Sequence, residues 1–321
     1  MTPAHNARRL RVALLASLLA PLVASTVACA GRRAETGASD GAKQSFEYQG
    51  RTRSYVVRAP AGLTRTSAPL PVVFVLHGGG GNASNAEQMT GFTRLVERER
   101  IIVVYPEGTG RFRNRLLTWN AQHCCGPAMT ERVDDVGFIS ALIDTLAAHY
   151  PVDQRRIYAT GMSNGGMMSH RLGRELSTRI TAVAPVVGAV FGDEAPPERP
   201  VSALMINGLL DKSVPAQGGL SGGRGASSWD GMPARPNVDQ GTYWARYNAC
   251  DATPQRDERG SVLRWTYRCP TGRAVELIQL KDNGHAWPGG KSGSRLGDTP
   301  STAIDATDVI WAFFKPLTRE R

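Results

Sequence analysis

The sequence lacks the patterns that would indicate a metalloprotein, a membrane-spanning protein or a repeat protein. Neither a C-x-x-C nor an H-E-x-x-H motif occurs in its 321 residues, so we expect no metal and no other cofactor. No internal repeat is present. The longest apolar run, residues 12–27, contains Pro21 and is shorter than the ~20 residues that a transmembrane helix needs.

Charged residues are also few, at 21% of the chain, whereas apolar residues make up 41%. A chain of this length and composition can bury a substantial core, so disorder over most of it is not expected. The net charge is +10, but the arginines are scattered and no nucleic-acid-binding motif accompanies them. We therefore expect a globular protein that binds no nucleic acid.

Residues 1–30 have the organisation of an export signal. Arginines at positions 8, 9 and 11 precede the apolar run, and Ala28-Cys29-Ala30 supplies the small residues of a cleavage site. The segment Thr26–Cys29 also resembles a bacterial lipobox, whose cysteine becomes lipidated, although Leu is usual at the position of Thr26. Two outcomes stay open: free secretion, or a membrane tether through Cys29 with residues 31–44 as a flexible linker. Either places the protein outside the cell, in the periplasm or on the cell envelope.

After Cys29, four cysteines remain, and in an oxidising compartment we expect them to form disulfides. Four cysteines allow three pairings. We favour Cys250 with Cys269, because they flank a compact segment that ends in a strand-like run. That choice leaves Cys124 to pair with its neighbour Cys125.

Apolar strand patterns alternate with amphipathic helix patterns over residues 45–317. Strands are expected at 71–76, 101–105, 157–159, 181–187, 203–207, 263–268 and 275–280, with a hairpin at 45–59; helices are expected at 85–98, 134–146, 238–248 and 302–314. Long loops are expected at 108–130 and 217–228. We interpret Asp134 and Asp135 as N-terminal capping and helix-dipole charges of their helix. The alternation predicts one α/β domain, with a mostly parallel sheet covered by helices on both faces.

The segment Gly161-Met-Ser-Asn-Gly165 has the form of a nucleophile elbow. It lies between a short apolar strand and a helical pattern, and its glycines allow neighbouring backbone to approach closely. The bare G-x-S-x-G pattern is a weak signal, because Gly219–Gly223 also matches it around Ser221. That second match has no strand before it and no helix after it. We therefore take Ser163, and not Ser221, as the candidate nucleophile.

A serine nucleophile needs an imidazole base, which in turn needs a carboxylate to orient it. In the α/β-hydrolase order of Ser, Asp and His, the candidate base is His285, which follows the last apolar strand in a turn-rich loop. Asp211 is the candidate acid, because it lies just beyond an apolar strand and should reach the same edge of the sheet. Among the other carboxylates in the interval, the alternatives that we consider are Asp193, Glu194, Asp230 and Asp239.

Acyl transfer also needs two backbone N–H groups that face the developing oxyanion. The N–H of Asn164, directly after the nucleophile, is the first candidate. The second is expected from the glycine-rich loop after His77, at Gly79 or else at Gly80. We expect His77 to shape this loop rather than to transfer a proton.

Five motifs together resemble the exported polyhydroxybutyrate depolymerase and feruloyl esterase group of α/β-hydrolases. They are Leu76-His-Gly-Gly-Gly80, Trp119-Asn120 with Cys124-Cys125-Gly126, Val133-Asp-Asp-Val136, Gly161-Met-Ser-Asn-Gly-Gly-Met167 and Gly284-His-Ala-Trp-Pro-Gly289. The resemblance implies a serine esterase whose triad is carried here by Ser163, Asp211 and His285. Asn207-Gly208 departs from the His-Gly that the group commonly has before the acid-bearing turn.

The resulting hypothesis is two-step hydrolysis of a carboxylic ester through an acyl-enzyme on Ser163. The acyl group stays open between an aromatic one, such as ferulate, and a short hydroxyalkanoate. Trp119 and Trp287 lie in loops near the expected site and could stack on an aromatic group, or could equally pack within the protein. The rival functions are a serine peptidase of the same fold and a noncatalytic surface-binding lipoprotein.

Overall fold

The computed structural model describes residues 41–112, 115–223, 225–294 and 296–320, which belong to one compact unit. The expected export signal, Cys29 and most of the expected linker lie outside these residues. The last two residues of the expected linker, Lys43 and Gln44, already belong to the first strand. None of the helices in the described ranges has the length and apolar character to cross a membrane.

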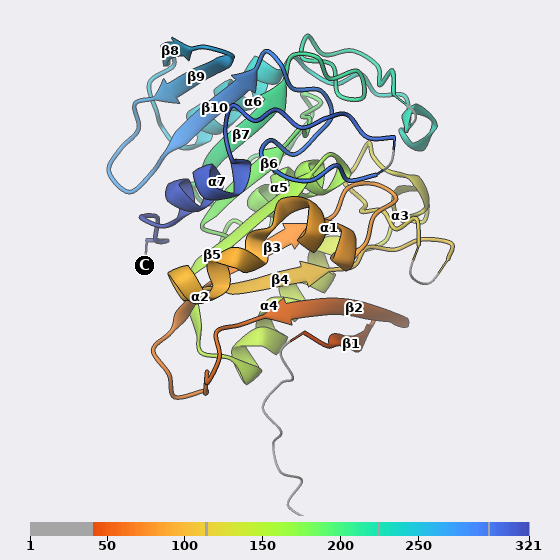
Figure 1. Ribbon diagram of the computed structural model, residues 1–321, viewed down its shortest axis with the longest axis vertical. Coiled ribbons are helices and arrows are strands. Elements are labelled where there is room, and N and C mark those ends of the chain that lie inside the picture. Colours follow the sequence, from red (N-terminus) through yellow and green to blue (C-terminus); the bar gives the residue numbers. More distant parts are fainter. Residues whose placement is uncertain (1–40, 113–114, 224, 295, 321) are drawn as a thin grey trace, which may run out of the picture. The chain divides into compact units, whose positions relative to one another are not determined.

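A ten-stranded sheet forms the centre of this unit (Figure 1). Its strands are β1 (Lys43–Tyr48), β2 (Arg51–Arg58), β3 (Leu70–Leu76), β4 (Ile102–Pro106), β5 (Val152–Met162), β6 (Ala182–Val186), β7 (Ser202–Gly208), β8 (Gln255–Arg259), β9 (Val262–Tyr267) and β10 (Val275–Leu280). The order across the sheet is β1-β2-β4-β3-β5-β6-β7-β10-β9-β8. The six strands from β4 to β10 in this order are parallel, and an antiparallel pair extends each edge.

The sequence patterns predicted the buried strands but not β8. All five residues of β8 are polar and exposed, so no apolar alternation marks it, and it is a strand because its backbone pairs with β9. The expected N-terminal hairpin is confirmed. Its turn residues Gln49 and Gly50 both have positive φ, as the tight turns that join antiparallel strands require.

Seven α-helices are found in the described residues. They are α1 (Ala83–Thr90), α2 (Leu95–Glu99), α3 (Gly126–Thr130), α4 (Asp135–His149), α5 (Asn164–Glu175), α6 (Asn237–Tyr247) and α7 (Ala306–Phe314). The single helix expected at 85–98 is wrong, because α1 ends at Thr90. Its capping residue Gly91 adopts φ +66 and donates its N–H to the carbonyl of Glu87. A short 3₁₀ turn, Phe92–Arg94, connects α1 to α2.

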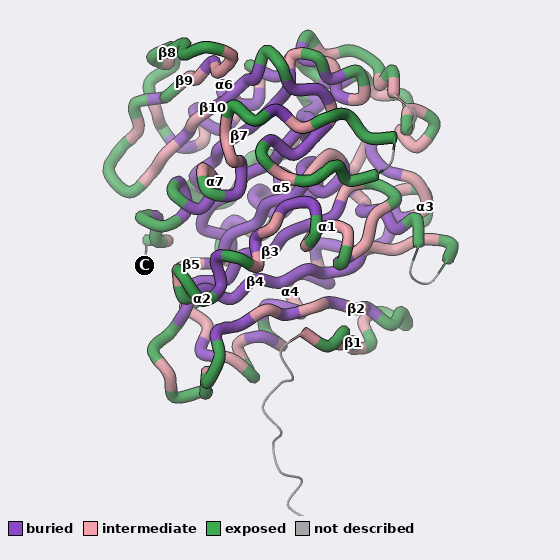
Figure 2. The backbone as a smooth tube through the Cα atoms, in the orientation of Figure 1, coloured by how far each residue is buried: buried purple, intermediate pink, exposed green. Residues whose placement is uncertain are grey.

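Helices cover both faces of the sheet, which confirms the expected α/β arrangement (Figure 1). Along β3, Phe74 and Leu76 join the core cluster that contains the apolar residues of α4, α5 and α6, whereas Val73 and Val75 join the cluster of α1, α2 and α7. This alternation follows from the period of two residues in a strand. Figure 2 shows the central strands buried along their length, because both of their faces are covered.

Both expected disulfides are present, Cys250 with Cys269 and Cys124 with Cys125. The peptide bond between Cys124 and Cys125 is cis. The expected capping of α4 is confirmed for Asp134, whose side chain accepts a hydrogen bond from the N–H of Gly137.

Candidate active site

Ser163 occupies a sharp turn between the end of β5 and the start of α5. Its φ of 57° and ψ of −121° are unusual for a residue with a side chain and place it in the strained conformation of a nucleophile elbow. Its N–H donates to the carbonyl of Val186 on β6 (2.9 Å). A Cβ on Gly161 would lie 2.6 Å from the carbonyl oxygen of Leu76, so the end of β3 packs directly against the turn. The turn therefore requires glycine at this position.

The structure brings Asp211 and His285 together at the carboxyl ends of β7 and β10. Asp211 Oδ2 lies 2.7 Å from His285 Nδ1, and Oδ1 accepts hydrogen bonds from the N–H groups of Ser213 and Val214 (both 2.8 Å). The Asp211 side chain is 1% exposed and that of His285 is 20% exposed. A carboxylate fixed in this way holds the proton of the imidazole on Nδ1, which leaves Nε2 free to accept a proton.

Asp298 also contacts the His285 loop. Its Oδ2 accepts a hydrogen bond of 2.6 Å from the backbone N–H of His285. No sequence signal points to Asp298, because it lies in a Gly- and Ser-rich loop without periodicity. Its contact with the backbone fixes the loop and leaves the imidazole ring to Asp211.

The four alternative carboxylates contact other groups. Asp193 and Asp230 bind the two ring nitrogens of His123, Asp239 pairs with Arg235, and Glu194 accepts hydrogen bonds from the N–H groups of Phe191 and Gly192. Ser221 lies in the loop between β7 and α6, and no strand-turn-helix surrounds it.

His170 also follows Ser163 in the sequence, but no carboxylate lies between the two, so it does not fit the order of Ser, Asp and His. The structure agrees, because His170 is buried within α5 and both of its ring nitrogens have partners. Nδ1 accepts a hydrogen bond from Trp244 Nε1 (2.9 Å), and Nε2 lies 3.1 Å from Gln240 Oε1. His170 is therefore a core residue.

The two residues expected to donate to the oxyanion, Asn164 and Gly79, lie close together next to the elbow. A Cβ on Gly79 would be 3.7 Å from Cβ of Asn164, so the glycine-rich loop passes directly over the start of α5. Asn164 is the first residue of α5, where an N–H has no acceptor within the helix, and no acceptor for the N–H of Gly79 is found in the described residues. The alternative, Gly80, already donates to the carbonyl of Leu117 (2.8 Å).

The buried side chain of Asn164 is fixed by the backbone of Trp119. Its Oδ1 accepts from the N–H of Trp119 (2.7 Å), and its Nδ2 donates to the carbonyl of the same residue (2.9 Å). The indole of Trp119 donates to the carbonyl of His77 (3.0 Å). The His77 ring accepts from the N–H of Gly108 through Nε2, while Nδ1 lies 2.8 Å from the carbonyl of Gly78. As expected, His77 shapes the loop.

Both tryptophans that were expected near a substrate are enclosed by the protein. Trp119 is 0% exposed and Trp287 is 1% exposed. Trp287 donates to Thr307 Oγ1 (3.1 Å) and packs edge-on against Phe92. The alternative of packing within the protein therefore applies to both, since neither ring offers a surface on which a substrate could stack.

A different aromatic pair lies on the α5 side of the elbow. Phe191 and Trp229 pack edge-to-face at 5.7 Å. Phe191 is in the loop that follows β6, and Trp229 pairs through its backbone with Cys124, whose Sγ is 3.7 Å from Nδ2 of Asn164. The sequence did not single out this pair, because the two rings are distant in the chain and meet only through the loops.

The two buried histidines determine how stability responds to acid. Burial lowers the pKa of His77 to about 4 and that of His170 to about 3, from an ordinary value of 6.5. Below about pH 6.5 the unfolded chain takes up a proton at each histidine while the folded protein does not. The stability present above this pH is therefore lost as the pH falls toward 4, by up to about 2.7 kcal/mol per pH unit for two groups.

Urea unfolding at pH 6.5, 5.5 and 5.0 measures this loss. The free energy of unfolding of a His170→Asn variant should fall less steeply with pH than that of the wild-type protein, by about 1.4 kcal/mol per pH unit. His123 does not obscure the result. Burial opposes its protonation, but Asp230 and Asp193 raise its pKa above the ordinary value of 6.5. Its contribution to stability therefore changes above pH 6.5, outside the range of this measurement. An equal slope in both proteins would contradict the assignment.

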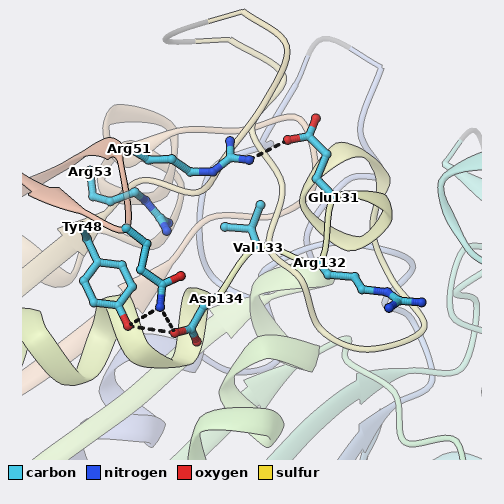
Figure 3. Close-up of a pocket in the computed structure, with 8 residues that line it drawn as sticks. Tyr48, Arg51, Arg53, Glu131, Arg132, Val133 and Asp134 are labelled. Atoms are coloured by element: carbon cyan, nitrogen blue, oxygen red, sulfur yellow. Dashed lines mark hydrogen bonds and ion pairs between the residues drawn. The ribbon is translucent and has the colours of Figure 1, made fainter.

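In the described ranges, a pocket of about 380 Å³ is lined by α6 and the loop after β6, and the elbow, Asp211 and His285 are not part of it. A pocket of about 190 Å³ lies between the β1–β2 turn and the segment before α4 (Figure 3). It is not lined by the elbow, by Asp211 or by His285. Across the described ranges, His, Cys, Asp and Glu side chains form no group of three or more suited to a metal ion.

The fold is that of the α/β-hydrolases, a class in which a serine at an elbow after a central strand acts with a later acid and histidine. The acetyl xylan esterase from Aspergillus awamori superposes on 86% of this chain and 99% of its own with a TM-score of 0.57; at 13% identity this likeness concerns the fold. A family model described as esterase PHB depolymerase matches residues 53–238. The chain belongs to this esterase family.

Two curated relatives agree with the family. Feruloyl esterase B from Piromyces equi is 30% identical over 246 residues, which is 75% of this chain but only 44% of that protein. The putative esterase NocK from Nocardia uniformis subsp. tsuyamanensis is 30% identical over 280 residues, 81% of this chain and 80% of its own. The chain thus spans less than half of the first relative and most of the second.

Proposed function

We propose that the protein is a serine esterase that hydrolyses carboxylic esters through an acyl-enzyme on Ser163. The observation that carries this proposal is the hydrogen bond between Asp211 and His285 at the edge of the sheet where Ser163 follows β5. Membership of an esterase family supports the same reaction.

In the first half of this reaction, Ser163 Oγ attacks the ester carbonyl carbon while His285 Nε2 takes its proton. Asp211 stabilises the imidazolium through Nδ1, and the N–H groups of Asn164 and Gly79 bind the oxyanion. The imidazolium then gives its proton to the alcohol oxygen as the ester C–O bond breaks. In the second half, His285 deprotonates a water molecule that attacks the acyl-enzyme. The imidazolium then returns this proton to Ser163 Oγ as the bond between Oγ and the acyl carbon breaks, and the acid leaves.

We propose that the acyl group is aromatic and of the ferulate type. Trp229 supports this choice, because its ring is partly exposed and packs against the buried Phe191 on the α5 side of the elbow. A short hydroxyalkanoate, as the name of the family suggests, is the alternative.

The test compares ferulate release from methyl ferulate with hydroxybutyrate release from a soluble oligomer, with Ser163→Ala as the blank. Trp229→Ala should lower kcat/KM for methyl ferulate about tenfold and leave the oligomer unaffected. Trp265→Ala is the matched control, because Trp265 is a half-buried tryptophan on β9, near the far edge of the sheet. A preference for the oligomer, unchanged by Trp229→Ala, would show the hydroxyalkanoate alternative; inactivity on both esters would point to a peptidase or a noncatalytic protein.

We further propose that the protein is exported and lipidated at Cys29. Its two disulfides support export, because such bonds persist in oxidising compartments. Labelling of cells with radioactive palmitate should mark the wild-type protein and not a Cys29→Ser variant. An unlabelled wild-type protein in the medium would show free secretion instead.

A further inference from the structure

Asp134 and Asp135 are adjacent in the sequence but differ in their surroundings. Asp134 caps α4, bonds to the hydroxyl of Tyr48 and lines the pocket in Figure 3. Asp135 is 0% exposed and pairs with Arg53, which is 3% exposed, at 2.6 Å. Asp135 therefore does not cap the helix, although it supplies the expected acidic charge in the first turn of α4. Because desolvating an ion pair is costly, its burial calls for another explanation.

The two oxygens of Asp135 hold different segments of the chain. Oδ1 accepts from the guanidinium of Arg53 on β2, which also lies 3.9 Å above the ring of Phe138. Oδ2 accepts a hydrogen bond of 2.8 Å from the backbone N–H of Asn120. Burial raises the pKa of Asp135 and Arg53 opposes this effect. Asp135 thus connects the N-terminal hairpin to the loop that contains Asn120.

Residues 117–120 are in contact with both sides of the proposed oxyanion hole. The carbonyl of Leu117 accepts from the N–H of Gly80, in the glycine-rich loop. The backbone of Trp119 makes two hydrogen bonds to the side chain of Asn164, at the start of α5. One short segment therefore sets the distance between the loop and the helix whose N–H groups would bind the oxyanion.

We propose that Asp135 is a positioning residue that holds residues 117–120, and through them the oxyanion hole, in place. It touches neither the substrate nor Ser163 and acts through Asn120 and Trp119. This inference rests on the proposed esterase function. Because the oxyanion forms only in the transition state, a displaced hole lowers kcat and leaves substrate binding largely unchanged.

The first test compares Asp135→Asn with Asp134→Asn. Arg53 and the N–H of Asn120 donate to different oxygens of Asp135, and in an amide one of these two positions becomes an NH2 group that can only donate. We expect kcat to fall about ten- to hundredfold with KM nearly constant, because loss of one oxyanion donor typically costs 10²- to 10³-fold. Asp134→Asn is the matched control: the amide oxygen can still accept from the N–H of Gly137 and keep the cap, so kcat should stay within about twofold. A wild-type kcat for a folded Asp135→Asn protein would overturn the proposal.

A second variant separates positioning from stability. In Arg53→Met with Asp135→Leu, apolar side chains replace the whole ion pair, a change that often restores stability in buried sites. The acceptor for Asn120 is still missing, so we expect the melting temperature to recover while kcat stays low. Recovery of both would show that Asp135 is merely structural.

Hydrogen exchange makes the inference testable without turnover. Amide exchange at Asn120 and Trp119 should accelerate in Asp135→Asn and not in Asp134→Asn. If wild-type protein hydrolysed no ester while this difference appeared, the proposed function would fail and the positioning of the segment would stand. Unchanged exchange together with active wild-type protein would refute the positioning alone.

Discussion

Ser163→Ala is expected to lower kcat for an ester by a factor of about 10⁵ to 10⁶ while the protein stays folded. The side chain at this position is half-buried, and the bonds that fix the elbow come from its backbone N–H and carbonyl, which alanine keeps. His285→Ala should be nearly as severe. Because nucleophile and base act as one unit, the double variant Ser163→Ala with His285→Ala should be no slower than either single variant.

Hydrolysis of a chromogenic acetate or butyrate ester by purified variants measures these rates. The chain contains its own control, since Ser221 lies in the second G-x-S-x-G sequence, and Ser221→Ala should retain wild-type kcat. Loss of activity in Ser221→Ala, or independent effects of Ser163→Ala and His285→Ala that multiply in the double variant, would contradict the assignment of the nucleophile and its base.

The elements that could be predicted from the sequence are those in which one local pattern carries the information. The buried runs of β3 and β4, and the cap at Asp134, follow from periodicity and from the preference of aspartate for helix starts. Asp211 and His285 were paired as candidates because each follows an apolar strand, and parallel neighbouring strands end at the same edge.

The parts that could not be predicted depend on contacts between distant segments. The strand β8 has no apolar residue and exists only through its partner β9. Asp135 and Asp134 have the same side chain and adjacent positions, and only the tertiary structure makes one a cap and the other a buried ion-pair partner. For Trp119, position in a long loop left contact with a substrate and packing within the protein equally open. The loop folds back, and the indole bonds to the carbonyl of His77 inside the core.

Gly165→Ala is expected to impair both folding and catalysis, because a methyl group has no room at this position. A Cβ on Gly165 would lie 2.5 Å from the carbonyl oxygens of both Leu76 and His77, which are backbone atoms that no rotamer change can remove. The end of β3, or the start of α5, would have to move. Overpacking of this kind typically costs about 1–3 kcal/mol of stability.

The same movement would separate the two proposed oxyanion donors, since Gly79 follows His77 on one side and Asn164 precedes Gly165 on the other. A misplacement of about 1 Å in an active site costs roughly a hundredfold in rate, so kcat should fall at least that far even below the melting temperature.

Gly225→Ala is the matched control for Gly165→Ala, because its added Cβ would meet no atom within 4 Å and its φ is −89°. Urea unfolding and kcat, measured on both variants, should show a loss only for Gly165→Ala. If Gly165→Ala lost stability but kept its kcat, the glycine would serve packing alone, and the oxyanion donors would have to lie elsewhere than at Gly79 and Asn164.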